Sequence, residues 1–369
     1  MVIASYIANA FCLDDEPILL SEVTDTIDVQ FTATRPDGTT DSFTEVYSPD
    51  SNGQIVIRDL GRMALSYFEP YSFSLDKDTA VGNGVLLDAK VYASDTENLL
   101  GSFTKRFYYA NCRTTISDPL KYRGFLSRFH RRTIHPDQQI ILGFMRNGQT
   151  LGVGVKTTNQ YRQEDIMTVS EDHQLLISCF SLDRICNQAT LQPGDPWDPN
   201  IMEYVIFYLY DEDGNIDAIQ FDIDRSFKMQ RTDFVFYNAF GVPDSLFFTG
   251  RDTRTAEMEA EFSTAAHEYR KLSTELNVKH QVNSGYIDEV TRDTAEDLIT
   301  SSFAWLYSGK QIGEKIAITE VRFEESLPRT EPVNVAITYR LANETQRIID
   351  RDMTLDYRIF DHTFGVEFE

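Results

Sequence analysis

Residues 203–224, EYVIFYLYDEDGNIDAIQFDID, form the clearest structural unit in the chain. The first half is apolar on both faces, which predicts a central strand or one that is covered on both sides. In the second half Ile219, Phe221 and Ile223 alternate with polar residues, so we expect one face of this strand to meet water. The Asp-Gly pair between the two halves favours a tight turn. The segment therefore predicts a β-hairpin.

Similar short strands, separated by turns rich in Gly, Asn and Asp, lie on both sides of this hairpin. The alternation is clean at residues 26–34 (TIDVQFTAT), and the turn that follows contains Asp37 and Gly38. Many short strands with such turns are typical of β-sandwiches. Because 369 residues exceed the size of one comfortable core, we expect a mainly β protein with two or three β-sandwich-like domains and one or two short helices.

Changes in composition along the chain predict four segments. They are an N-terminal β-sandwich (1–112), a basic connector (113–136), a second β-rich domain (137–250) and a C-terminal β domain (251–369). Within the last segment, residues 291–304 predict a helix, because Thr291 suits an N-cap and acidic residues occupy the first turn.

Two further stretches of the C-terminal segment bear on its fold. The Ala, Glu, Lys and Leu content of residues 253–276 favours a helix. However, MEAEFSTA and STELNVKHQV, which lie in or overlap that region, alternate as strands do, so helix and strand both stay open. Residues 352–360 (DMTLDYRIF) alternate cleanly and predict a strand.

Charge and hydropathy disfavour several classes of partner. The formal net charge of −24 argues against binding nucleic acid or an anionic membrane. No stretch approaches the ~18 apolar residues of a membrane span. No Lys or Arg precedes the first apolar run, and Asp14 and Asp15 close it early, so we expect no signal peptide and no lipid anchor. Four scattered cysteines without a CxxC pair favour free thiols in a reducing compartment.

No motif identifies a catalytic, cofactor or metal site. The stretch DEDGNID (211–217) lacks both obligatory EF-hand carboxylates when Gly214 takes the sixth position of the loop. The Gly-x-Gly at 152–154 lies between strand-like flanks and favours a β-bulge or tight packing. His130 and His135 have no third ligand nearby in the sequence. We therefore predict no cofactor, no metal and no enzymatic activity, with an enzyme on a β scaffold as a minor alternative.

Two local features are candidates for an interface between subunits or domains. Residues 121–132 are basic and contain no acid, which is typical either of a solvated linker or of a segment that meets an acidic face of a neighbouring subunit. The aromatic stretch YNAFGVPDSLFFTG (237–250) surrounds a Gly-Val-Pro turn and is either domain core or a junction with the next domain or subunit. The candidate interface residues are Lys121, Arg123, Arg128, Arg131, Arg132, Phe240 and Pro243.

The order of segments in the C-terminal third resembles that of a phage protein family. FVFYNAFGVPDSLFFTG (234–250) is followed by VNSGYIDE (282–289), AEDLITSSFAWLY (295–307) and EKIAITEV (314–321). This order is similar to the strand, Asn-x-Gly-Tyr turn, helix and returning strand of phage and prophage tail proteins of the distal-tail and baseplate β-sandwich type. Residues 44–63 (TEVYSPDSNGQIVIRDLGRM) resemble the opening pattern of some of these proteins.

The resemblance implies a non-enzymatic component of which several copies form a ring that joins the tail tube to the baseplate or to receptor-binding parts. The expected partners are other copies of the chain and other tail proteins, and the expected location is the virion tail, assembled in the host cytoplasm. The resemblance also implies that residues 258–269 form a strand. A cell-surface carbohydrate-binding or adhesion protein built of β-sandwiches is the alternative.

Overall fold

The computed structural model describes residues 1–69, 73, 75, 79–81, 84–95, 98–114, 116, 118–145, 151–157, 163–169, 175–189, 197–226, 230–265, 268–308, 311–324 and 334–342. Strands dominate these residues, and the predicted mainly β class is confirmed. Three α-helices accompany the strands within the described residues. The sequence analysis predicted only the last of them.

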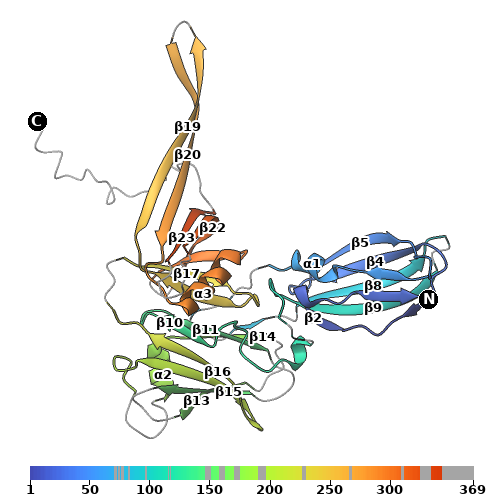
Figure 1. Ribbon diagram of the computed structural model, residues 1–369, viewed down its shortest axis with the longest axis horizontal. Coiled ribbons are helices and arrows are strands. Elements are labelled where there is room, and N and C mark those ends of the chain that lie inside the picture. Colours follow the sequence, from blue (N-terminus) through green and yellow to red (C-terminus); the bar gives the residue numbers. More distant parts are fainter. Residues whose placement is uncertain are drawn as a thin grey trace, which may run out of the picture.

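The N-terminal part of the chain forms a sandwich of two sheets (Figure 1). The larger sheet has the order β2-β9-β8-β4-β5, with bounds Asn9–Phe11, Leu99–Tyr108, Val85–Ala93, Ile27–Thr34 and Thr40–Tyr47. The smaller sheet has the order β1-β3-β6, with bounds Val2–Ile3, Ile18–Ser21 and Ile55–Ile57. The alternation of β4 explains the sandwich, since Val29 and Phe31 are buried in the same core as Leu60 of α1 (Leu60–Leu65).

The middle of the chain forms two more sheets. One has the order β10-β16-β15-β12-β13, with bounds Arg131–Ile134, Gly214–Ile223, Tyr204–Asp211, Leu151–Thr157 and Gln163–Val169. The other has the order β11-β14-β7, with bounds Ile140–Met145, Leu175–Phe180 and Thr79–Val81. The predicted hairpin is confirmed as β15 and β16, with β15 in the centre of its sheet. The helix α2 (Leu182–Ala189) follows β14.

The Gly-x-Gly of β12 lies at a β-bulge and is tightly packed, in agreement with the sequence prediction. A bulge interrupts the pairing of β12 with β13 between Val153 and Gly154. The rings of Tyr210 and Tyr208 lie over Gly152 and Gly154, respectively, where a Cβ atom on either glycine would come within about 2 Å of a ring carbon. The two glycines therefore make room for tyrosines of the neighbouring strand.

The sheet of β11, β14 and β7 is covered on both faces. On β11, Leu142 and Phe144 pack into the core beneath the five-stranded sheet, whereas Ile141 packs with Val235 of the C-terminal sheet. Its third strand, β7, comes from the N-terminal third of the chain and pairs with β14. Sheet pairing thus crosses the segment boundaries predicted at residues 112 and 136, since β10 also belongs to the middle sheet.

The C-terminal sheet has seven strands in the order β18-β17-β21-β22-β23-β20-β19. Their bounds are Pro243–Phe248, Thr232–Tyr237, Ala304–Ser308, Gln311–Glu324, Asn334–Leu341, Glu268–Asn283 and Asp252–Ala265. Because β17 and β18 pair within this sheet, the boundary predicted at residue 250 falls inside it. The predicted strand at 352–360 lies outside the described residues.

The predicted helix is present as α3 (Glu289–Thr300), which packs on the seven-stranded sheet through Ala295 and Leu298. Its N-cap differs from the prediction: the Asp288 carboxylate accepts a hydrogen bond from the Thr291 backbone N–H at 2.8 Å. Asp is an acceptor at least as good as Thr at this position, and the Thr291 backbone already lies inside the helix. The helix also ends before 304, since Ala304 begins β21.

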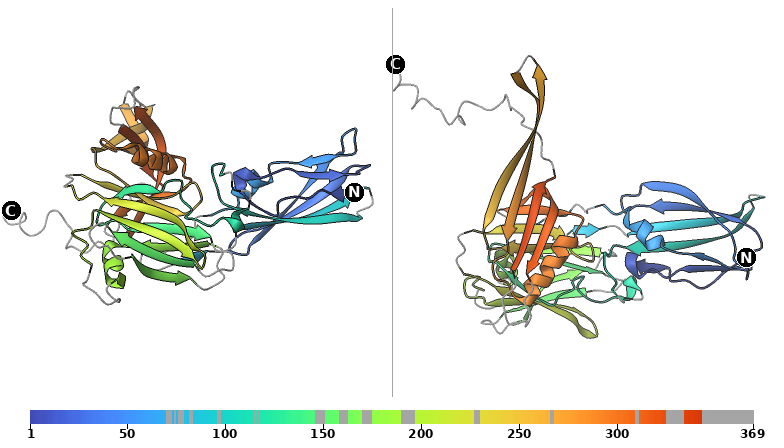
Figure 2. Two further views of the ribbon diagram at one scale, coloured as in Figure 1. Left: turned by 60° about the horizontal axis from the view of Figure 1, so that its bottom comes forward. Right: turned by 45° about the horizontal axis from the view of Figure 1, so that its top comes forward.

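The strands β19 and β20 form a long antiparallel hairpin. The described part of residues 253–276, for which the sequence left helix and strand open, is therefore strand. Only residues 280–283 of β20 pair with β23. We call the rest of the hairpin, residues 255–265 and 268–279, the arm; it projects from the body of the molecule (Figures 1 and 2). Alternation prevails over helix propensity here because burial of Val278 and Val282 fixes one face of β20 at the base of the arm.

Candidate functional site

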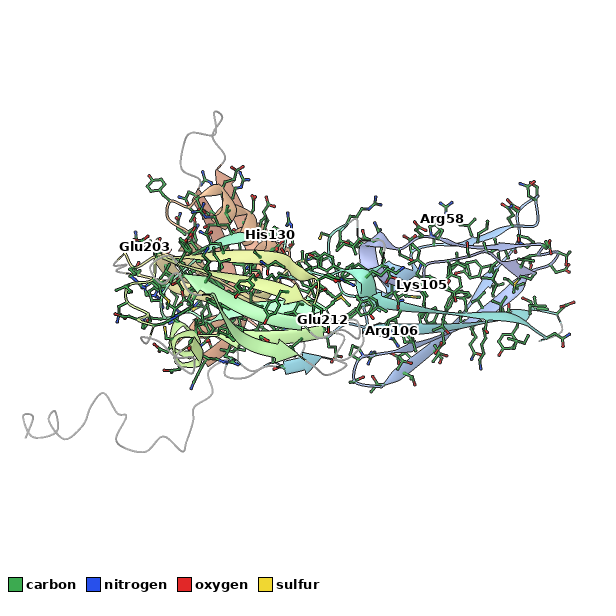
Figure 3. All side chains as sticks on the ribbon, turned by 90° about the horizontal axis from the view of Figure 1, so that it is seen from below. Arg58, Lys105, Arg106, His130, Glu203 and Glu212 are labelled. Carbon is green, nitrogen blue, oxygen red and sulfur yellow. The ribbon has the colours of Figure 1, made fainter. Side chains whose placement is uncertain are left out.

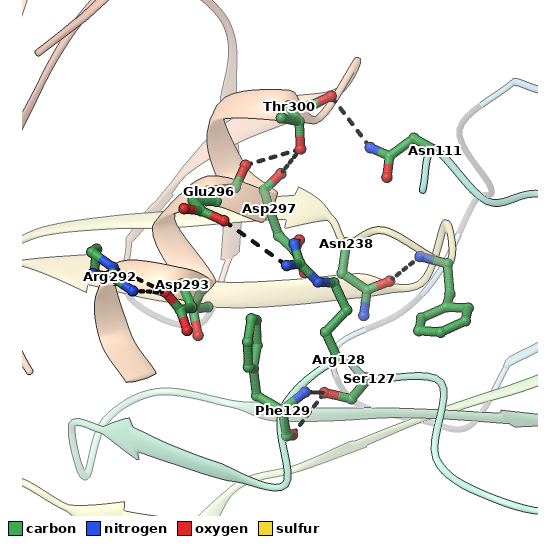
Figure 4. Close-up of polar contacts among 12 residues, drawn as sticks. Asn111, Ser127, Arg128, Phe129, Asn238, Arg292, Asp293, Glu296, Asp297 and Thr300 are labelled. Carbon is green, nitrogen blue, oxygen red and sulfur yellow. Dashed lines mark hydrogen bonds and ion pairs between the residues drawn. The ribbon is translucent and has the colours of Figure 1, made fainter. Parts of the chain in front are cut away.

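Three of the predicted interface residues, Arg128, Arg132 and Phe240, lie where the first sandwich, the middle sheets and the C-terminal sheet meet, a region we call the junction; Figure 4 shows it around Arg128. Its centre is the turn after β17. The Asn238 side chain accepts hydrogen bonds from the backbone N–H groups of Phe240 (2.9 Å) and Val242 (3.2 Å) and donates one to the carbonyl of Leu126 (2.9 Å). Gly241 has a φ of +70°, which glycine adopts without strain. One buried amide therefore shapes the turn and fixes it to the connector.

Phe240 joins this turn to the first sandwich. Its ring contacts the ring of Phe11 edge-on, with centroids 5.6 Å apart. The two rings belong to one apolar cluster with members from all three parts of the chain: Phe11, Tyr108, Ala110, Leu126, Met145, Leu175, Phe240 and Val242. Pro243 is buried next to the cluster, opposite Tyr237 in the β17–β18 pair. Phe240 thus lies at a contact between domains of the same chain, whereas Pro243 is buried within the C-terminal sheet.

Two arginines of the basic segment form ion pairs with buried carboxylates across the junction; Arg128 itself is 36% exposed, whereas Arg132 is buried. Arg128 Nη1 lies 2.7 Å from Oδ1 of Asp297, a carboxylate on α3 that is 1% exposed (Figure 4). Arg132 on β10 is 6% exposed and pairs with the buried Asp244 of β18. Both pairs connect the basic segment to the C-terminal sheet and its helix, so the segment is a structural link rather than a solvated linker at these positions.

The other three basic residues are exposed and also have acidic partners in this chain. Lys121 lies 3.5 Å from Asp118, Arg123 lies 3.0 Å from Asp211 and Arg131 lies 2.6 Å from Asp222. Exposed pairs of this kind contribute little stability, because water screens them and the side chains lose freedom. The acidic face that we expected on a neighbouring subunit is therefore supplied, for all five residues, by the chain itself.

Burial changes the titration of two carboxylates in this region. Burial raises the pKa of Asp297, although the hydrogen bond and charge of Arg128 oppose the shift. Burial also raises the pKa of Asp233 on β17 to about 6, against the opposing effect of Arg231. Arg231 donates a 3.0 Å hydrogen bond to Asp233.

A further buried ion pair, between Lys105 and Asp15, lies inside the first sandwich; Lys105 is labelled in Figure 3. The fully buried Lys105 ammonium donates hydrogen bonds to Asp15 and to the carbonyl of Glu16. Asp15 also accepts a hydrogen bond from the Gly61 backbone N–H at 3.1 Å, which ties the larger sheet to α1. Burial raises the pKa of the neighbouring Cys12 thiol, so this cysteine is a protonated core residue and not a nucleophile.

The remaining candidate motifs also have structural roles. Within DEDGNID, Asp211 pairs with Arg123, and Asp217 accepts a hydrogen bond from the Phe125 backbone N–H at 2.8 Å. The described residues contain no group of three or more His, Cys, Asp or Glu side chains placed to hold a metal ion. All four cysteines are free. In the part of the chain that the structure describes, no helix is long and apolar enough to cross a membrane.

No protein-family model matches the chain, and no curated protein matches it significantly. The functional argument therefore depends on the geometry of the chain. Sequence reasoning missed three residues of the junction: Asn238, Asp244 and Asp297. It also did not single out the arm, although the strand alternation of residues 253–276 was visible.

The arm pairs with no other strand among the described residues. There, residues 255–265 and 268–279 pair only with each other. Met258, near the middle of β19, is 58% exposed. One cross-strand ion pair, Lys279 Nζ to Glu257 at 3.5 Å, lies on the arm. The arm is therefore a long two-stranded ribbon with little support from the body.

Proposed function

We propose that the chain is a non-enzymatic structural component of a phage tail or a related injection apparatus, in which several copies form a ring that joins the tail tube to the baseplate or receptor-binding parts. The observation that carries the proposal is the arm. An isolated two-stranded ribbon is at best marginally stable in water, and open strand edges and faces are sites for pairing with another chain. A ribbon of this length is suited to contacting a neighbouring subunit.

The junction supports the same proposal. Its polar groups fix three parts of the chain relative to one another. Asn238 holds the turn, and Arg128 and Arg132 pair with carboxylates of the C-terminal part. A subunit that transmits geometry between a tube and a baseplate needs such a rigid body. Arg132, Asn238 and Asp244 line a cavity of about 10 Å³, which has room for about one water molecule and none for a substrate.

The side chains favour a tail component over the alternative of a carbohydrate-binding surface protein. Sugar sites commonly use exposed aromatic rings. Neither tryptophan offers such a ring, since Trp197 is buried in the middle core and Trp305 packs against Phe303 and Tyr237. Among the large hydrophobic side chains of the described residues, Tyr286 is the one exposed aromatic ring, at 82% exposure. The proposed partners are accordingly other copies of the chain and other tail proteins, in the virion tail after assembly in the host cytoplasm, and not nucleic acid, membrane or cofactor.

The mass of the purified protein in solution tests the proposal. We expect light scattering to give a discrete multiple of the 42.3 kDa chain and negative-stain microscopy to show closed rings. The measurement is made over a range of concentrations from about 1 to 100 μM, which covers assembly driven by weak contacts. A monomer at every concentration, with specific binding on a glycan array, would contradict the proposal and support the alternative.

A further inference from the structure

The two faces of the arm differ in chemistry. In the register of the hairpin, Ala256 lies opposite Val278, Met258 opposite Leu276, and Ala260 opposite Thr274. Alternate residues of a strand share a face, so these residues belong to one side of the ribbon. We call this side the apolar face: Ala256, Met258, Ala260, Thr274, Leu276 and Val278.

The opposite side is acidic. The intervening pairs place Glu257 opposite Asn277, Glu259 opposite Glu275, and Thr255 opposite Lys279. We call this side the acidic face: Thr255, Glu257, Glu259, Glu261, Ser273, Glu275, Asn277 and Lys279. Glu257 and Glu259 on this side are exposed, and ionised carboxylates favour a face that stays in water.

The apolar face continues the core of the body outward. Val282, on the same side of β20, is fully buried in the cluster that contains Leu298 of α3. The next residue outward on this side, His280, stacks on Tyr339 of β23 with ring centroids 5.1 Å apart. Val278 is still buried, with 8% of its surface exposed, whereas Met258, in the next pair outward on this side, is 58% exposed. The sheet face thus keeps its apolar pattern beyond the point where the body covers it.

We infer that the apolar face of the arm binds a second copy of this chain; the inference rests on the proposed multi-copy assembly. The net charge of the chain indicates both which face of the arm makes the contact and what binds there. Every copy carries a net charge of −24, so an acidic face turned toward another copy is repelled. The central pairs of the apolar face carry no ionised group, and among the described residues the one charge in contact with Met258 is the positive Lys271 ammonium, 3.2 Å from its Sδ. An exposed contiguous apolar surface bounded by polar residues is typical of a protein–protein contact.

The size of the arm indicates how much of the contact it supplies. Eleven residue pairs at ~3.3 Å each and two strands at ~5 Å each give the arm a face of roughly 360 Å². A stable interface buries about 800 Å² on each partner. The arm therefore supplies less than half of such a contact.

Two matched variants of the full chain test the inference. Met258→Glu places a negative charge on the apolar face, and Thr255→Glu places the same charge on the acidic face of the same strand. We expect Met258→Glu to raise the dissociation constant of the assembly at least about tenfold, because a carboxylate must lose water on docking. Thr255→Glu should change it by less than about threefold. Sedimentation velocity over a concentration series measures both, and circular dichroism checks that both variants fold, since both sites are exposed.

The outcomes separate the inference from the proposed function. If the wild-type chain assembles and Met258→Glu assembles equally well, the apolar face is not the contact and the inference is overturned, while the proposed assembly stands. Equal weakening by both variants overturns it as well, because the effect is then one of total charge. If the wild-type chain is monomeric at all concentrations, the proposed function fails and the inference fails with it.

Discussion

The junction and the arm are built from similar residues and differ in where those residues find partners. At the junction, apolar rings and charged groups meet complementary groups of the same chain, as Phe240 meets Phe11 and Arg132 meets Asp244. On the arm, Met258 continues an apolar pattern into solvent. The difference separates residues that hold one subunit together from residues that are available to another molecule. It also explains why the basic segment, which the sequence offered as a subunit contact, is a poorer candidate than the arm.

The largest effect that the comparison predicts is at Arg132. Arg132→Ala leaves the buried Asp244 carboxylate without its cation, which costs about 3–5 kcal/mol of unfolding free energy. Arg131→Ala is the matched control, since its side chain is 66% exposed and an exposed ion pair contributes little to stability. Chemical denaturation measures both variants. Equal losses at the two neighbouring positions would show that the junction does not depend on burial of this pair.

Asn238→Ala is predicted to cause the next largest loss of unfolding free energy. The substitution removes two accepted hydrogen bonds within the turn and leaves the Leu126 carbonyl without its donor, which costs about 2–3 kcal/mol in a buried site. Asn200→Ala is the control, because Asn200 makes a comparable local contact with Asp198 in an exposed loop. A loss at position 238 no larger than at position 200 contradicts the role of the turn. Equilibrium denaturation in urea provides the comparison.

The stability of the junction region also depends on pH through Asp233. Its folded-state pKa of about 6 lies above the ordinary value, so the folded state binds more protons than the unfolded state between about pH 4 and pH 6. Stability from this group is therefore present at low pH and is lost as pH rises through 6, by about 1 kcal/mol between pH 5 and pH 7.

Asp233→Asn removes this titration and leaves the other groups of the chain unchanged. We expect the difference in unfolding free energy between the wild type and this variant to shift in favour of the variant as pH rises from 5 to 7. Denaturation at four pH values measures that difference. A difference that stays constant with pH means that Arg231 keeps the carboxylate ionised throughout.

The sequence predicted the local elements well and their long-range partners poorly. Alternation identifies β4 and the β15–β16 hairpin, because the apolar residues of a strand lie on the face that is buried. The pairing of β7 with β14 was not predictable, since it joins residues almost one hundred positions apart. Local patterns carry no record of such a contact.

The candidate site shows the same limit. Arg131 and Arg132 are adjacent and chemically identical, yet the alternation of β10 turns one toward water and the other toward Asp244. Reading β10 as a strand would have distinguished them, but the strand is only four residues long and follows a basic run. For the arm, the alternation of Ala256, Met258 and Ala260 was legible, whereas the absence of a covering layer is a property of the whole fold.

The smallest effect is predicted for Met258, and it is the sharpest test of the comparison. Met258→Ala changes the unfolding free energy of the dissociated chain by less than about 0.5 kcal/mol, because the side chain is exposed and few contacts are lost. Met145→Ala makes the identical substitution in the buried cluster of the junction and costs about 2–5 kcal/mol. Denaturation must be followed below the concentration at which copies associate, since association adds to apparent stability. If Met258→Ala destabilises the single chain as much as Met145→Ala does, the apolar face of the arm is core packing of its own subunit, and the contrast between the two regions does not hold.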